Sequence, residues 1–310
     1  MRPALVLCVL AACFHDPAPA PVAPPVRAPR VNPGVYDPLG FLPVDAEVVM
    51  SVDVNQLRAS ALWKQFEPAV SAKAGDTLGK LRTQCGVELL PSVKQIAMGL
   101  QRLGDERGPS GVIVVRGLDR KAFWACVEQL RGADPRVMVA NGVMLVKGEP
   151  GQNPVALTFA GASTMVLVTS PTASPDELER VIKRGAPLRA STAFLETFGR
   201  IEPHRTAWFA VNSSGKTLDK LATLGIRATA FSGWVDLANG FAAAARLRLD
   251  SEDSARNLAG LGQAQLGQVK ALVEEVELSS EDADLVFRVV MTQEQLESIV
   301  RMFGVFAGGP

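Results

Sequence analysis

The alternation of apolar and polar residues predicts a chain rich in short strands. β-Branched runs bounded by turn residues predict strands over residues 46–54, 95–103, 111–116, 206–211, 228–236, 241–249, 276–279 and 285–291, with two further strands each in 137–146 and 155–169. Asn141-Gly142 and Asn239-Gly240 predict tight hairpin turns, because this dipeptide readily adopts positive φ angles. The body of the protein is therefore expected to contain mainly antiparallel strand pairs.

Apolar residues at helical spacing predict helices between these strands. Leu57, Leu62, Phe66 and Val70 form one such series. The helix-starting residues are predicted to be Asn55, Asp119, Ser174 and Asp250, with the helix after Asp250 extending to residue 275 and a last helix over 293–303.

The order of the elements repeats along the chain. Asp53 and Asn212 each end the first strand of a half, and Leu118-Asp119 and Leu249-Asp250 each precede a helix. We therefore predict an α+β fold of two tandem split β-α-β (ferredoxin-like) units with mostly antiparallel sheets, over residues 41–190 and 191–310. The alternative is a chance alignment within an alanine-rich sequence.

The N-terminus has the residue pattern of an export signal peptide. Arg2 precedes a short apolar run over residues 4–12, too short to span a bilayer. Leu10-Ala11-Ala12-Cys13 resembles the lipobox of bacterial lipoproteins, which implies that residues 1–12 are removed and that Cys13 carries a lipid. In that family the next residue sorts the protein, and Phe14 implies the outer membrane. Residues 13–40 are expected to form a lipidated, Pro/Ala-rich linker.

A second resemblance concerns the start of the body. Leu42-Pro43-Val44-Asp45, followed by Ser51-Val52-Asp53, Leu57 and Ser60, is similar to the start of uncharacterised exported bacterial proteins with repeated α+β units. The resemblance implies a fold and a location and no activity.

Composition and charge narrow the class of partner. Lys plus Arg and Asp plus Glu are balanced at 32 each, and aromatic residues make up only 6%. Neither the electrostatic attraction nor the stacking platforms of a nucleic-acid binder are expected. No segment after the N-terminus reaches the roughly 18 to 20 apolar residues of a membrane span.

One motif resembles a nucleotide-binding loop. The segment Ala210-Val211-Asn212-Ser213-Ser214-Gly215-Lys216-Thr217 is similar to the phosphate-binding loop of P-loop hydrolases, with alanine replacing the first glycine. That substitution, the short remaining chain and the exported location argue against nucleotide binding. Turn and cap chemistry explains the same residues.

Other candidate sites are weak. His15 and His204 have no third ligand that would complete a metal site or a catalytic triad. The acidic clusters Glu274-Glu275-Glu277 and Glu281-Asp282-Asp284 lack calcium-loop spacing, so we expect solvated loops, with calcium binding as the alternative. Trp63, Trp124, Trp208 and Trp234 are expected in the core or between domains, with an apolar ligand groove as the alternative.

Two cysteines remain after processing. An oxidising compartment favours a Cys85–Cys126 disulfide. The predicted topology opposes it, because helices of a split β-α-β unit could hold the two Cα atoms beyond about 7 Å. The pairing stays open at this point.

The sequence predicts a location better than an activity. We expect a lipid-anchored outer-membrane protein, facing the periplasm or the cell surface, that binds or supports another envelope component without being an enzyme. No cofactor, metal, nucleotide or nucleic acid is expected; the partners are the membrane, through the anchor, and an envelope protein. The alternatives are a carrier of a lipid or other apolar ligand and an exported hydrolase that uses carboxylates.

Overall fold

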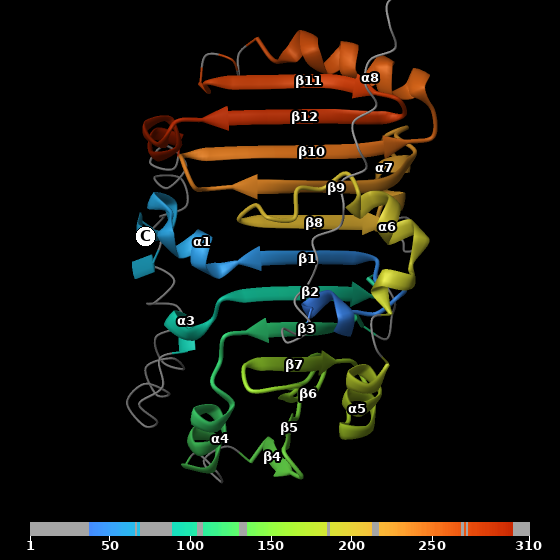
Figure 1. The fold of residues 1–310 in the computed structure, drawn as a ribbon. Coiled ribbons are helices and arrows are strands. Elements are labelled where there is room, and N and C mark those ends of the chain that lie inside the picture. Colours follow the sequence, from blue (N-terminus) through green and yellow to red (C-terminus); the bar gives the residue numbers. More distant parts are fainter. Residues whose placement is uncertain are drawn as a thin grey trace, which may run out of the picture. The chain divides into compact units, whose positions relative to one another are not determined.

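One antiparallel sheet organises the described part of the chain (Figure 1). The structure is a computed structural model that describes residues 37–65, 67–68, 89–103, 108–129, 135–184, 187–212, 217–267, 270 and 272–299. The chain divides into residues 1–35 and residues 36–310, and every described residue belongs to the second unit.

The secondary structure is mostly strand. The strands are β1 (Val48–Asp53), β2 (Gln95–Gln101), β3 (Ser110–Arg116), β4 (Val137–Ala140), β5 (Val143–Val146), β6 (Val155–Phe159), β7 (Thr164–Thr169), β8 (Ala207–Asn212), β9 (Ala228–Asp236), β10 (Phe241–Leu249), β11 (Glu275–Glu281) and β12 (Asp284–Met291). The helices are η1 (Pro38–Phe41), α1 (Val54–Ala59), α3 (Leu89–Ser92), α4 (Arg120–Gln129), α5 (Pro175–Lys183), η2 (Leu188–Ala190), α6 (Thr192–Phe198), α7 (Asp219–Ala222) and α8 (Glu252–Gln265).

The strand order corrects the predicted fold. The sheet runs β11-β12-β10-β9-β8-β1-β2-β3-β7-β6-β5-β4, and β1 pairs with β2 on one side and with β8 on the other. The two halves of the chain therefore share one sheet. The prediction of two tandem ferredoxin-like units is wrong, although the chain is α+β. The strands on either side of α1 are antiparallel neighbours, so no β-α-β crossover forms there.

A physical reason for this difference lies in the sheet edges. The strand order is β1-β2-β3-β7-β6-β5-β4 in the first half and β8-β9-β10-β12-β11 in the second. Each half alone would leave its first strand, β1 or β8, with an unpaired row of backbone N–H and C=O groups. Pairing β1 with β8 satisfies both rows. The alternation of residues along a strand reports which face is buried and not which strand lies alongside.

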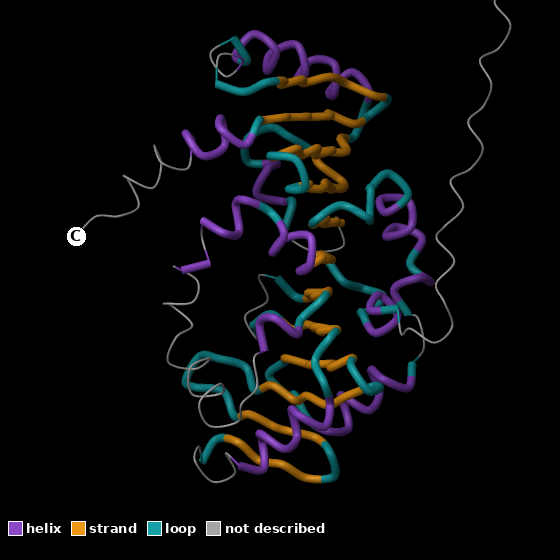
Figure 2. The backbone as a smooth tube through the Cα atoms, turned by 60° about the vertical axis from the view of Figure 1, so that its left-hand side comes forward, coloured by secondary structure: helices purple, strands orange, loops and turns teal. Residues whose placement is uncertain are grey.

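Helices cover both faces of the sheet (Figure 2). On one, which we call the α6 face, η1, α5, η2 and α6 pack over a core that includes Val49, Val114 and Trp208. On the opposite face, α1 and α4 pack over a second cluster that includes Phe159 and Met165. The α8 helix packs mainly against β11. It lies on that opposite face, where the Leu278 side chain of β11 is next to Gly262 of α8.

Two of the four predicted helix caps are confirmed and two are wrong. Asp119 and Ser174 accept hydrogen bonds from backbone N–H groups of α4 and α5, as predicted. The caps at Asn55 and Asp250 were wrong. Asp53 caps α1 through a 3.0 Å bond from the Gln56 N–H, and Ser251 caps α8, which ends at Gln265 and not at residue 275. Several adjacent polar residues can cap a helix, and the backbone geometry selects one.

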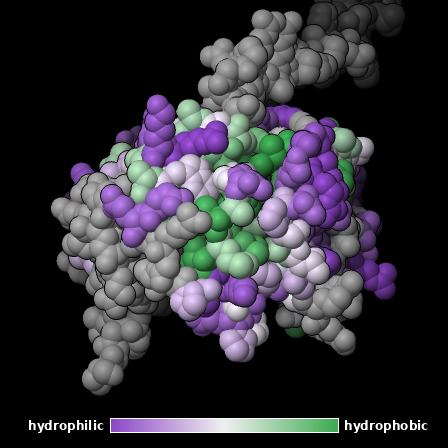
Figure 3. All heavy atoms as spheres, turned by 90° about the horizontal axis from the view of Figure 1, so that it is seen from below, coloured by the Kyte–Doolittle hydropathy of each residue, from purple (hydrophilic) through white to green (hydrophobic). Residues whose placement is uncertain are grey.

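The two edges of the sheet differ in character. The β11 edge carries Glu275, Glu277 and Glu281, which discourage pairing with another strand. The β4 edge consists of four apolar residues, and Met138 is exposed. In the view from below, toward the β4 end in Figure 1, hydrophobic side chains gather in the middle of the visible surface with hydrophilic ones around them (Figure 3).

Candidate functional site

A cavity with charged walls lies on the α6 face, where α6 meets the second half of the sheet. Its volume is about 320 Å³, within the usual range for small-molecule sites. Its charged lining residues are Glu196, Arg200, Arg246, Arg248 and Asp284. We call this cavity the arginine pocket.

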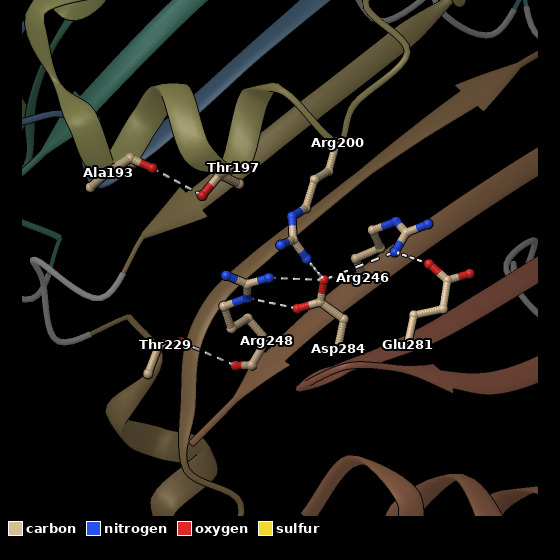
Figure 4. Close-up of polar contacts among 8 residues, drawn as sticks. All are labelled: Ala193, Thr197, Arg200, Thr229, Arg246, Arg248, Glu281 and Asp284. Carbon is tan, nitrogen blue, oxygen red and sulfur yellow. Dashed lines mark hydrogen bonds and ion pairs between the residues drawn. The ribbon is translucent and has the colours of Figure 1, made fainter. Parts of the chain in front are cut away.

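The strand register brings these side chains together. Arg246 and Arg248 are two residues apart on β10, so both point to the same face of the sheet. Arg248 lies directly opposite Asp284, the first residue of β12. Arg200 reaches the same carboxylate from the turn after α6 (Figure 4). The charged side chains of the pocket thus come from three segments that are far apart in the sequence.

Asp284 is the centre of the pocket. Its side chain is only 2% exposed, and it accepts hydrogen bonds from Arg248 Nε at 2.7 Å, from Arg248 Nη2 at 3.2 Å and from Arg200 Nη1. Burial alone would raise the pKa of Asp284. The hydrogen bond from Arg248 and the charges of Arg200 and Arg248 outweigh burial, and the pKa is lowered from its ordinary value. The same hydrogen bond raises the pKa of Arg248. Both groups stay charged near neutral pH.

The arginines keep N–H groups for another partner. Within the described residues, Arg200 and Arg246 each use one guanidinium nitrogen in ion pairs, and Arg248 uses two. A guanidinium has three nitrogens and five N–H donors, so each of the three retains at least one nitrogen. All three side chains are between 28% and 38% exposed, which leaves them in contact with solvent. The pocket can therefore donate hydrogen bonds to an added anion.

The sequence-based interpretation of the second acidic cluster was wrong for Asp284. We expected Glu281-Asp282-Asp284 to form a solvated loop or a calcium site. Asp282, with φ of 52°, does belong to the turn between β11 and β12, but Asp284 is buried among arginines. The available signal was Arg246-Leu247-Arg248, two arginines on one face of a predicted strand, which requires an acidic partner when that face is covered.

The nucleotide-loop motif is described only at its ends. Residues 213–216 lie outside the described residues, whereas Asn212 lines the arginine pocket and Thr217 begins the next turn. The Thr217 hydroxyl donates to the buried Glu47 carboxylate over 3.3 Å. The absence of nucleotide binding stays a prediction.

The other predicted site residues are scattered. His204 is exposed, and its backbone carbonyl accepts a hydrogen bond from Gln56, while His15 lies outside the described residues. Trp208 and Trp234 are buried opposite each other on β8 and β9, which confirms their placement in the core. Trp124 packs against the cluster beneath α4, and Trp63 is half-buried.

The cysteines are described in part. Cys126 on α4 is 5% exposed and disulfide-bonded. Cys85 and Cys13 lie outside the described residues, so the Cys85–Cys126 pairing and the lipidation of Cys13 stay predictions.

Within the described ranges, no three His, Cys, Asp or Glu residues are grouped to hold a metal ion. In the same ranges no helix is long and apolar enough to cross a membrane.

Comparison with known proteins identifies a fold and no family. No protein-family model matches the sequence, and no curated protein matches it. Among solved structures, crystal forms III, I and IV of TP0453 superpose with TM-scores of 0.55, 0.53 and 0.52. The alignments cover 86% of this chain and 97% or 98% of TP0453, at 10% to 12% sequence identity. The fold is shared with TP0453. At this level of identity the likeness concerns the fold alone.

Proposed function

We propose that this chain is a lipid-anchored, non-enzymatic binding protein of the cell envelope, and that the arginine pocket binds a small anion. The observation that carries the proposal is the set of three arginines around a cavity of about 320 Å³, each with guanidinium nitrogens left over after pairing within the described residues. Guanidinium groups hold carboxylate and phosphate oxygens through parallel N–H bonds. The anchoring part of the proposal rests on the lipobox and the linker.

The charges of the pocket support binding over catalysis. General acid–base catalysis needs a group whose pKa lies near the working pH. The pKa of Asp284 is lowered and that of Arg248 is raised, so both shifts move away from neutrality. These groups supply fixed charge to a ligand and no proton. The charged lining also favours an anion over a lipid or other apolar ligand, which is the alternative that the sequence leaves open.

An NMR titration tests the proposed function. The full-length protein, purified in non-ionic detergent, is titrated with acetate, with inorganic phosphate and with uncharged acetamide while the arginine Nε–H resonances are followed. We expect saturable shifts with the two anions and none with acetamide. The double variant Arg200→Gln and Arg246→Gln should weaken anion binding at least about tenfold, since each charged hydrogen bond contributes roughly 1.5–3 kcal/mol.

The matched control is Arg256→Gln, because Arg256 lies on α8, is well exposed and pairs only with Asp253 among the described residues. It should bind anions as the wild type does. The proposed function fails if neither anion saturates the protein, or if the double variant binds as tightly as Arg256→Gln.

A further inference from the structure

The two carboxylates that hold the arginines differ sharply in burial. Asp284 is 2% exposed and touches Arg200 and Arg248, with Arg246 Nη1 3.9 Å away. Glu281, at the end of β11, is 55% exposed, and Arg246 Nη1 donates to its Oε2 over 2.6 Å. Arg246 lies between the two acids (Figure 4). One acid is part of the folded core and the other is at the surface.

These two ion pairs have different energies of separation. Removing a buried carboxylate from its arginines leaves uncompensated charge in a poorly solvated place, which is strongly unfavourable. An exposed pair such as Arg246–Glu281 is worth little, because water solvates both partners once they separate. An anion that enters the pocket would therefore displace Glu281 and leave Asp284 in place.

From this contrast we infer that Glu281 is a placeholder, and that the ligand of the arginine pocket carries a carboxylate that replaces the Glu281 carboxylate on Arg246. The inference rests on the proposed function. Glu281 adjoins the turn at Asp282, so its side chain can move into solvent without disturbing the β11–β12 ladder. The ligand then gains Arg246 and the remaining N–H groups of Arg200.

The charge of the pocket favours a carboxylate over a phosphate. Three arginines and two acids, Glu196 and Asp284, line the pocket, which leaves a net charge of +1. A carboxylate monoanion neutralises that charge, whereas a phosphate dianion leaves an excess negative charge beside the buried Asp284. The expected ligand class is a small organic acid or the terminal carboxylate of a peptide.

The test compares the acetate affinity of a variant that lacks the Glu281 charge with that of a variant that lacks another glutamate charge on the same strand. Glu281→Gln should tighten acetate binding about two- to fivefold, the range expected for losing one exposed competing ion pair. Glu277→Gln is the control: Glu277 lies four residues earlier on β11, on the same face, and the substitution changes the net charge equally. It should leave acetate affinity within about 1.5-fold of the wild type, because Arg246 pairs with Glu281 and lies near Asp284, whereas Glu277 lies directly opposite Arg288 of β12. At pH 8, where phosphate carries roughly two negative charges, acetate should bind more tightly than phosphate.

The outcomes separate this inference from the proposed function. If the wild type binds anions through Arg200 and Arg246 but Glu281→Gln binds acetate no better than Glu277→Gln, the placeholder inference is overturned and the proposed function stands. Tighter binding of phosphate than of acetate at pH 8 overturns the carboxylate assignment. If no variant binds either anion, the proposed function itself fails.

Discussion

The Arg248 guanidinium holds both carboxylate oxygens of Asp284, with Nε 2.7 Å from Oδ1 and Nη2 3.2 Å from Oδ2. This two-pronged pair joins β10 to β12, and Arg200 adds a link from the segment after α6. The contact from Arg200 thus joins the segment after α6 to the sheet beside the arginine pocket. Asp284 therefore lies both where these segments are joined and where we propose that the anion binds.

Asp284→Asn should destabilise the protein. The amide has nearly the same shape but carries no charge, so Arg200 and Arg248 lose their buried counter-ion. We expect the free energy of unfolding to fall by about 2–3 kcal/mol, below the usual cost of breaking a fully buried pair because the arginines remain partly solvated. Urea denaturation measures the change. Glu281→Gln serves as the control, with an expected loss under about 1 kcal/mol; an equal loss in both variants would contradict the assigned role of Asp284.

Acid should weaken the fold through its low-pKa carboxylates. The pKa of Asp284 is lowered despite its burial, and that of Asp236 is lowered by the Ala238 N–H and by Arg205, also against an opposing effect of burial. A carboxyl group whose pKa is lower in the folded than in the unfolded state adds stability that is complete above the unfolded value, about 3.9. That stability disappears as the pH falls through the folded value.

The measurement is the urea midpoint between pH 7 and pH 2. We expect a steep loss of stability below about pH 4 in the wild type and a shallower one in Asp284→Asn, which has no charge to lose. Asp253→Asn is a suitable comparison, because Asp253 is 83% exposed and its ion pair with Arg256 lies on the surface of α8. A wild-type profile that coincides with that of Asp284→Asn would refute this account.

Cys126 should contribute no free thiol to the native protein. It is buried and disulfide-bonded, and Cys85 is the partner that the sequence suggests once Cys8 is removed and Cys13 is acylated. We expect no alkylation in the denatured, unreduced protein and two alkylated cysteines after reduction, as counted by mass spectrometry. Two alkylated thiols before reduction would exclude the pairing.

Cys13→Ser should release the protein from the membrane. Each buried CH₂ of an acyl chain contributes about 0.8 kcal/mol to anchoring, so loss of the lipid removes most of the membrane affinity. Labelling with a palmitate analogue, followed by fractionation, should show a labelled membrane protein for the wild type and an unlabelled soluble one for Cys13→Ser. Cys126→Ser should keep the label. An unlabelled wild type, or a variant that stays equally membrane-bound, would disprove the anchor.

Features that depend on adjacent residues could be predicted from the sequence. The hairpins at Asn141-Gly142 and Asn239-Gly240 form as expected, with φ of 54°, 73° and 103° at Asn141, Gly142 and Gly240. Asp119 and Ser174 act at helix starts for the same reason, since a cap needs only the next three residues. Turn chemistry and apolar alternation are local properties, and a single chain displays them directly.

Features that depend on distant residues were decided by the tertiary structure. The sequence could not indicate that β1 would pair with β8, because strand alternation marks a buried face and leaves the neighbour unspecified. Nor could it indicate that Asp284 is buried, since an acid directly after a turn is ordinarily solvated. Only the β10–β12 register, together with Arg200 from the other side, supplies the arginines whose charge makes its burial favourable.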